Sequence, residues 1–275
     1  MTFIFILMVT PMAFAYTFIT VDPPSVSEND PSGINARSQI VGFYYDASDN
    51  EYGFLLYKGV FTTVAVSGAI ETNPLGINDR GQIVGIYVEA IDEDYYEHGF
   101  VWDKGVFTPL NYPGDSETFP SGINSHGQIV GYYYGADDNT HGFMWDKGVF
   151  TPLNYPGDSD TLALGINASG QVVGTYYDAN NYTHGFMLYK GVFTSFDAPD
   201  AIETWPYGIN DRGQIVGSYY GTSDNEHGFV LYKGVFTNVD VPDAIATYPA
   251  GINAGGQIVG SYWDGSTLHG FLATP

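Results

Sequence analysis

The chain lacks cysteine and carries little charge. Its 275 residues include no Cys, and only 14% of them are Asp, Glu, Lys or Arg. A disulfide framework, thiolate chemistry and cysteine-ligated metals are therefore excluded, whereas the cellular compartment stays open. Basic residues are the rarest, with 8 Lys and Arg against 31 Asp and Glu. A formal net charge of −23 leaves no basic patch for phosphates, so we expect no nucleic-acid partner.

Long apolar runs are also missing, apart from the first residues. Residues 1–15 are apolar and end in Met-Ala-Phe-Ala, which places Ala13 and Ala15 in the A-x-A cleavage pattern of a signal peptide. No Lys or Arg precedes this run, and Pro11 interrupts it. It is shorter than the about 20 residues that a transmembrane helix needs. We therefore expect a signal peptide over 1–15, a secreted or extracellular protein, and no membrane span.

Glycine and aromatic residues are abundant. The chain holds 35 Gly and 23 Tyr, which suits short strands separated by tight turns. Gly-Ile-Asn occurs six times, and consecutive copies are 43 or 46 residues apart. The glycines of these copies are Gly33, Gly76, Gly122, Gly165, Gly208 and Gly251. A period near 43 residues predicts one blade of a propeller per repeat.

Each repeat is expected to contain four strands. In the fifth repeat we predict strands over 203–209, 214–220, 227–232 and 235–239. The turn from Asn210 to Gly213 joins the first two strands, because Asn and Gly tolerate left-handed backbone. The dipeptide Lys233-Gly234 forms a two-residue hairpin turn between the last two strands.

The two ends of the chain predict a closed ring. The last repeat stops before its fourth strand, whereas Thr17-Phe18-Ile19-Thr20-Val21-Asp22 matches the fourth strand of the fifth repeat. The first strand of the chain can therefore complete the last blade and remove two exposed sheet edges. We predict an all-β fold, a six-bladed β-propeller of four antiparallel strands per blade, formed by 16–275 as one domain.

The repeats resemble those of the bacterial extracellular HAF family, which combine GIN-x-x-GQ-V-G with a following His-Ala-Phe. The resemblance covers all six units. This chain departs from the pattern with His-Gly-Phe in five units, with Tyr52-Gly53-Phe54 in the first, and with Ser38 in place of one turn glycine. The resemblance implies export and a repeat scaffold, and it offers no catalytic motif to carry over.

The predicted turns separate the charges. The connections after strands two and four share one end of the ring, which we call the acidic end because nearly all acidic residues lie there. All basic residues lie at the opposite, basic end, namely Arg37, Lys58, Arg80, Lys104, Lys147, Lys190, Arg212 and Lys233. Clustered carboxylates favour a bound cation, and oxygen ligands suit Ca²⁺. The metal candidates are Asp46, Asp49, Asp92, Asp94, Asp137, Asp138, Asp178 and Asp224.

These acids have a second interpretation. None of the loops contains the Asp-x-Asp-x-Asp-Gly pattern of a calcium loop. Asp and Asn also form turns, and acidity keeps an exported protein soluble. The sequence leaves both interpretations open.

A further set of acids stands five residues before the glycine of Gly-Ile-Asn. The positions are Glu28, Glu71, Glu117, Asp160 and Glu203, with Ala246 in the last repeat. The first strand of a blade is the innermost, so these residues are expected to ring the mouth of the central channel and bind a ligand there. Alternatively, each acid accepts hydrogen bonds from its own turn.

Histidine and aromatic residues supply the remaining candidates. We expect a structural role for the histidines that begin the third strand, because one per blade is too far apart to share a metal: His98, His141, His184, His227 and His269. Aromatic ligand-binding candidates differ between units and lie near the acidic end: Tyr95, Tyr96, Tyr182 and Trp205.

Three functions remain compatible with these patterns. The first is an exported, non-catalytic propeller, monomeric, that binds a glycan, a cation or a surface partner through its acidic end. The second is a polysaccharide hydrolase or lyase that uses carboxylates such as Glu117 and Glu203 with His141 or His184, although Gly-x-Ser-x-Gly and His-Glu-x-x-His are absent. The third is a structural surface or matrix protein that stacks acidic end to basic end.

Overall fold

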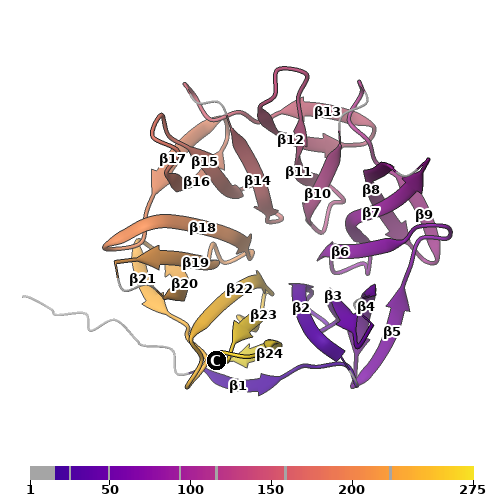
Figure 1. Ribbon diagram of the computed structural model, residues 1–275. Helices are drawn as coiled ribbons and strands as arrows, with labels where there is room; N and C mark the ends of the chain where they lie inside the picture. The colour runs from indigo at the N-terminus through magenta and orange to yellow at the C-terminus, as the bar shows by residue number, and fades with distance from the viewer. Residues whose placement is uncertain are drawn as a thin grey trace, which may run out of the picture.

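The computed structural model describes residues 16–275 except Ser25, Asp49, Glu93, 115–116, 158–159 and 223–224. The described strands form six four-stranded antiparallel sheets arranged around a central axis (Figure 1). The predicted six-bladed β-propeller is confirmed. The expected signal peptide over 1–15 and two metal candidates, Asp49 and Asp224, lie outside the described residues. Within the described part of the chain, no helix has the length and apolar character needed to cross a membrane.

The first three blades follow one another along the chain. Blade 1 contains β2 (Val26–Ile34), β3 (Ile40–Asp46), β4 (Glu51–Tyr57) and β5 (Val60–Val64). Blade 2 contains β6 (Glu71–Ile77), β7 (Ile83–Ile91), β8 (Asp94–Asp103) and β9 (Val106–Pro109). Blade 3 contains β10 (Thr118–Ile123), β11 (Ile129–Tyr134), β12 (Thr140–Asp146) and β13 (Val149–Pro152).

The last three blades complete the ring. Blade 4 contains β14 (Thr161–Ile166), β15 (Val172–Tyr177), β16 (Thr183–Tyr189) and β17 (Val192–Phe196). Blade 5 contains β18 (Ala201–Ile209), β19 (Ile215–Gly221), β20 (Glu226–Tyr232) and β21 (Val235–Asn238). Blade 6 contains β22 (Ala246–Ile252), β23 (Ile258–Trp263), β24 (Leu268–Thr274) and, from the other end of the chain, β1 (Thr17–Thr20).

The first strand closes the ring as predicted. β1 pairs antiparallel with β24, with Thr17 opposite Thr274 and Thr20 opposite Phe271. Phe18 contacts the ring of Phe271 edge-on at a centroid distance of 5.7 Å. The pairing covers the free edge of β24, which would otherwise offer unpaired backbone groups to another chain.

The core lies between blades. Two side chains of every blade are completely buried, a Val on the second strand and the Phe of the third. Val41 of blade 1 packs with Ile83 and Phe100 of blade 2, and Val259 of blade 6 packs with Phe54 of blade 1. Each fully buried side chain contributes roughly 1.5 to 3 kcal/mol. A single blade cannot bury both faces, so the ring is the unit of stability.

Glycine narrows the central channel. A Cβ atom added to Gly122 would lie 2.7 Å from the carbonyl oxygen of Leu164 and 3.2 Å from the Cα of Gly165 in the next blade. Neighbouring inner strands therefore approach each other backbone to backbone, which explains the glycine of Gly-Ile-Asn. On the axis, a cavity of only about 80 Å³ lies at these glycines and another of about 70 Å³ at the asparagines, with the isoleucines of Gly-Ile-Asn lining both.

The asparagine of Gly-Ile-Asn joins the blades. Each side-chain Nδ2 donates to the main-chain oxygen of the corresponding Asn in the next blade, at 3.0 to 3.1 Å, from Asn35 around to Asn253 and back to Asn35. Six such bonds form a closed ring around the channel. The Oδ1 atoms also accept main-chain N–H groups of their own turns, as Asn124 does from His126 and Gln128.

This ring corrects our interpretation of the first turn. Left-handed backbone occurs at Gly213 and its equivalents, including Ser38 at φ 56°, but at none of the six asparagines. The asparagines are required for their side-chain hydrogen bonds and not for their backbone conformation. The Lys-Gly hairpins agree with the prediction, because Lys233 and Gly234 both have positive φ, as type I′ turns require.

Candidate functional site

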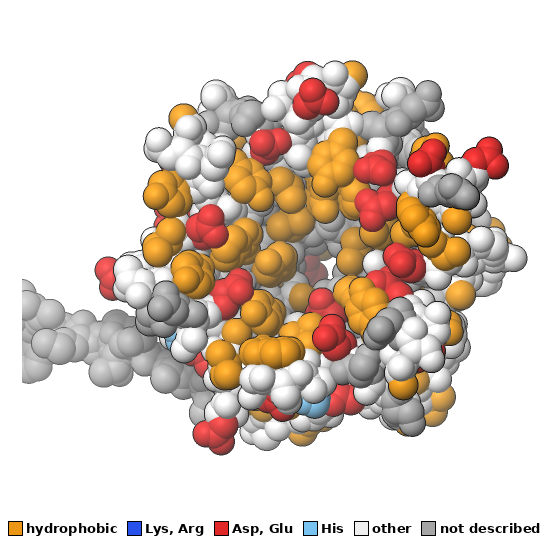
Figure 2. Space-filling view, viewed as in Figure 1, with side chains coloured by type: hydrophobic (Ala, Val, Ile, Leu, Met, Phe, Trp, Pro, Cys, Tyr) orange, Lys and Arg blue, Asp and Glu red, His pale blue; other side chains and the backbone are white. Residues whose placement is uncertain are grey.

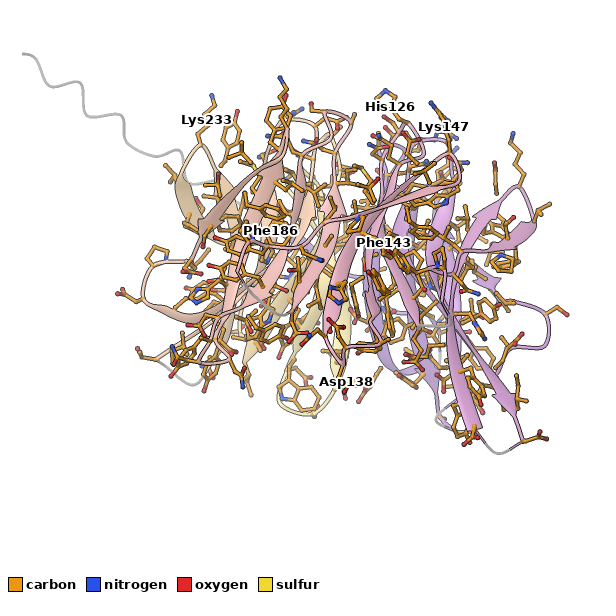
Figure 3. The ribbon with its side chains drawn as sticks, turned by 90° about the horizontal axis from the view of Figure 1, so that it is seen from above. His126, Asp138, Phe143, Lys147, Phe186 and Lys233 are labelled. Carbon is orange, nitrogen blue, oxygen red and sulfur yellow. The ribbon has the colours of Figure 1, made fainter. Side chains whose placement is uncertain are left out.

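The two ends of the ring differ in charge. Figure 3 shows His126, Lys147 and Lys233 at one end and Asp138 at the other. The face viewed in Figure 2 carries many acidic side chains and no Lys or Arg, and it is hollowed around the axis. This face is the acidic end defined above. A cationic or neutral ligand is favoured at such a surface and an anionic ligand is repelled.

The five acids of the predicted carboxylate ring have different surroundings. Glu28 is exposed, whereas Glu71, Glu117 and Glu203 are half-buried. Asp160 accepts a hydrogen bond from the main-chain N–H of Thr140 in the preceding blade, at 2.6 Å. The positions therefore differ in burial and in partners, and no uniform ring of equivalent ligands results.

Three further glutamates accompany this set. Glu97 and Glu226 directly precede the histidine of His-Gly-Phe in their blades, and Glu51 directly precedes Tyr52, which replaces that histidine in blade 1. Burial raises the pKa of Glu97, and the charges of Glu117 and Glu71 raise it further. Burial likewise raises the pKa of Glu226, with a smaller contribution from the charge of Glu203.

Glu51, Glu71, Glu97 and Glu117 influence each other's titration through their charges, and we call these four carboxylates of blades 1 to 3 the arc. Burial also raises the pKa of Glu51; the hydrogen bond from Tyr45 opposes this effect, and the charge of Glu71 adds to it. Glu51 is only 8% exposed, and its Oε1 has no hydrogen-bond donor. One buried oxygen of the arc therefore has no hydrogen-bond partner.

One end of the arc lines a pocket between blades 2 and 3, which we call the junction pocket. Its volume is about 470 Å³, and its walls are Tyr96, Glu97, His98, Asn111, Tyr112, Pro113, Gly114 and Glu117. Ligand sites usually measure about 300 to 1,000 Å³ and combine aromatic walls with a few polar groups. The junction pocket meets both criteria, whereas the axial cavities are too small for a sugar ring.

Two other pockets of the molecule differ from the junction pocket in the residues of their walls. The corresponding pocket between blades 5 and 6, of about 290 Å³, contains Glu226 and His227, with Ala246 in place of Glu117. A more open pocket of about 680 Å³ at the basic end includes Arg80 and Lys147 and has no Tyr, Trp or Phe in its walls. Only the junction pocket among these combines aromatic walls with two carboxylates.

The proposed metal ligands are dispersed. Among the described residues, no group of three His, Asp or Glu side chains is arranged to hold one metal ion. Asp46 accepts the N–H of Ser48 at 2.7 Å, and Asp178 accepts that of Asn180 at 2.8 Å. Asp92 and Asp138 lie at turn corners with positive φ, and Asp94 begins β8. A Ca²⁺ site remains a prediction without assembled ligands.

The histidines that begin the third strands connect the acidic-end loops to the blades. Nδ1 of His184 lies 3.0 Å from Asp197, and Nδ1 of His269 lies 2.9 Å from Asp22. His227 pairs with Asp240 at 3.1 Å. Each ring also packs against a tyrosine of the neighbouring strand, with centroid distances of 5.2 to 5.5 Å.

His141 departs from this pattern, and the difference predicts a stabilising substitution. Its Nε2 lies 3.0 Å from Asp137, but its buried Nδ1 has no partner, because Asn154 occupies the position of Asp197 and Asp240. We expect Asn154→Asp to stabilise the protein by about 0.5 to 1 kcal/mol. Urea unfolding measures the gain, and a His141→Gln background should remove it.

The pH dependence of this gain follows from His269. Burial tends to lower the pKa of His269, but the hydrogen bonds and charges of Asp22 and Asp264 together raise it. Stabilisation from such a pair is complete below the unfolded histidine pKa and is lost as pH rises through the folded pKa. The gain from Asn154→Asp should accordingly be larger at pH 6 than at pH 8, and an equal gain at both would contradict an ionic pair.

The aromatic candidates lie in different surroundings. Tyr95, in β8, is 69% exposed, Tyr182 is 48% exposed on a loop, and Trp205 is half-buried on β18. Tyr96, 42% exposed, is the one that lines the junction pocket. Sequence reasoning missed Tyr112 and the glutamates before the histidines. The recurrence of Glu at 51, 97 and 226 was the signal that could have identified the latter.

Comparisons with known proteins support the fold. No protein-family model matches the chain. No curated protein matches it either. Among solved structures, it is similar to TolB from Acinetobacter baumannii, with a TM-score of 0.59 and 12% identity over 92% of this chain and 65% of that one.

Two other solved structures illustrate the range of propellers it matches. A mutant of the Aleuria aurantia lectin in complex with Fucα1-6GlcNAc has a TM-score of 0.55 and 14% identity, over 91% of this chain and 93% of the lectin. The Pyrococcus horikoshii acylaminoacyl peptidase has a TM-score of 0.57 and 11% identity over 86% of this chain. The present chain spans only 41% of that peptidase. Identities this low show a shared fold alone.

Proposed function

We propose that this chain is an exported, non-catalytic β-propeller that binds a glycan through the junction pocket of its acidic end. The observation that carries the proposal is the composition of that pocket. Tyr96 and Tyr112 supply aromatic surface, and Glu97, Asn111 and Glu117 supply hydrogen-bonding groups. Sugar rings present apolar faces edged by hydroxyl groups, which such a combination of walls recognises.

The fold comparison gives the proposal secondary support. A lectin of the same fold, matched along almost its whole length, is described in complex with a fucosylated disaccharide. A fold hosts many functions, so the analogy adds to the pocket chemistry and does not replace it.

Tyr96→Ala tests the proposal. Binding of neutral cello-, manno- and N-acetylchito-hexaoses to the full chain can be measured by titration calorimetry. The aromatic wall is expected to supply much of the affinity, so the substitution should weaken binding of the preferred oligosaccharide roughly tenfold, or about 1.4 kcal/mol. Tyr57→Ala, at the basic end, is the matched control and should leave affinity unchanged. Equal affinity of Tyr96→Ala and the unaltered chain would remove the junction pocket as the site.

A polysaccharide hydrolase is the second candidate. Glu97 and Glu117 interact across a pocket, and one of them has a raised pKa, as a general acid requires. In this second candidate function, Glu97 takes the place of Glu203 as the carboxylate that acts with Glu117. His141 and His184 are engaged by Asp137 and Asp197. Release of new reducing ends from these hexaoses, abolished by Glu97→Gln, would favour the hydrolase over the binding protein.

A further inference from the structure

Two glutamates of the junction pocket repel each other. Glu97 lies near the start of the blade 2 hairpin strand β8, and Glu117 directly precedes β10 in blade 3. Both are half-buried and both line the pocket. Two carboxylates in such a site are stabilised by a positive charge between them.

The described protein supplies no Lys or Arg for this purpose. All eight Lys and Arg lie in turns of the basic end, and the face in Figure 2 shows none. His98 is the only imidazole in the pocket walls, and its Nε2 is directed to Glu89 at 3.8 Å. The positive charge must therefore come from solvent or from the ligand.

A second observation in the same arc also indicates a missing donor. Glu51 is more than nine-tenths buried, and neither its Oε1 nor the buried Oδ1 of Asn73 has a hydrogen-bond partner, although the Asn73 side chain lowers the pKa of the same carboxyl. The charges of Glu71 and Glu97 contribute to the raised pKa of Glu51, so Glu51 is linked electrostatically to the junction pocket although it does not line it.

We propose that the ligand of the junction pocket is an amino sugar whose free amine lies, as an ammonium group, between Glu97 and Glu117. This inference rests on the proposed glycan-binding function and specifies the class of glycan. The ammonium group would donate to both carboxylates, and Tyr96 would contact the sugar ring. Uronic acids and sulfated glycans are excluded by the same charges.

The pocket between blades 5 and 6 explains why the second glutamate matters. Its Glu226 accepts a hydrogen bond from Ser218 at 3.0 Å, and Ala246 replaces Glu117. Glu226 therefore already has a donor, and the other acids in these walls are Asp240, which pairs with His227 at 3.1 Å, and Asp243. We therefore expect the amine preference at the junction pocket and not at this one.

The experiment compares three probes on the full chain at low salt: hexamers of glucosamine, N-acetylglucosamine and galacturonic acid. The glucosamine hexamer should bind at least about tenfold more tightly than its acetylated form, because a charged hydrogen bond contributes more than a neutral one. Glu117→Gln should remove that preference, and Glu203→Gln, its equivalent in blade 5, should retain it. Circular dichroism and thermal melts establish that both variants are folded.

Each alternative outcome has a defined meaning. Equal affinity for the amino and acetylated hexamers would overturn the inference and leave the proposed glycan-binding function standing. Binding of the glucosamine hexamer that Glu117→Gln does not change would reveal non-specific attraction to the acidic end, and would also overturn it. No binding of any hexamer in this test or in the neutral panel would contradict the inference and the proposed function together.

Discussion

Replacing Asn124 by Asp is expected to destabilise the propeller by roughly 3 to 6 kcal/mol. Asn124 is 3% exposed, and its Nδ2 donates to Gln128 Oε1 at 2.9 Å and to the main-chain oxygen of Asn167 at 3.1 Å. Aspartate retains the two acceptor bonds to its own turn. It loses both donors and directs a charged oxygen at two acceptors, which is costly in a buried site.

Urea unfolding at two pH values measures this effect. Protonation of the introduced carboxyl restores one donor, so the loss of stability should be smaller at pH 5 than at pH 7. The control is Ser125→Asp, which adds the same charge at the next residue, where Asp79 and Asp211 stand in blades 2 and 5. The control should change stability by less than about 0.5 kcal/mol. Similar losses in both variants would mean that charge alone, and not the closed ring of hydrogen bonds, accounts for the effect.

Replacing Glu51 by Gln should instead stabilise the protein, by roughly 1 to 3 kcal/mol at pH 7. Tyr45 donates to Glu51 Oε2 at 2.5 Å, and glutamine can accept this bond through its own oxygen. The amide NH₂ then replaces an unpartnered buried oxygen beside Asn73, a side chain that already interacts with this carboxyl and whose own Oδ1 has no donor. The substitution also removes one of the interacting charges of the arc.

The pH dependence of this variant has a definite sign. The folded pKa of Glu51 is raised above its ordinary value of 4.5, so its carboxyl favours folding below that value and this advantage is lost as pH rises through the folded pKa. The advantage of glutamine should therefore be largest at neutral pH and should shrink towards pH 4.5. Thermal melts across this range measure it, and each 1 kcal/mol corresponds to about 2 to 4 °C in a domain of this size.

Glu226→Gln is the matched control for this prediction. Glu226 occupies the same position in blade 5, but Ser218 donates to its Oε1 at 3.0 Å. Its replacement should bring less stabilisation, because no oxygen is left without a donor. A larger gain at Glu226 than at Glu51 would refute the argument from the unpartnered oxygen.

The sequence pattern could not predict which two carboxylates lie together at the junction pocket. Carboxylates recurred at equivalent positions, but a repeat pattern gives only spacing along the chain. Glu97 and Glu117 lie on different blades, and the sequence pattern identified only Glu117 as a candidate. Their approach depends on how the connection between β9 and β10 crosses the acidic end, which no local pattern encodes.

The sequence alone determined the blade number, the strand order and the closing strand. The physical reason is that Gly-Ile-Asn, His-Gly-Phe and Lys-Gly repeat at a fixed period, and each motif acts through local turns or alternating burial. The match between residues 17–22 and the fourth strands was sufficient to place β1 beside β24.

Only the tertiary structure shows the ring of hydrogen bonds between asparagines, the narrow axis and the junction pocket. The asparagine side chains reach the next blade, so a turn preference explained only part of their role. The glycines restrict the axis at Gly-Ile-Asn to cavities too small for a sugar, and the pocket that combines aromatic walls with carboxylates lies at a blade junction. These features depend on contacts between residues about 43 positions apart, whose geometry is set only when the ring closes.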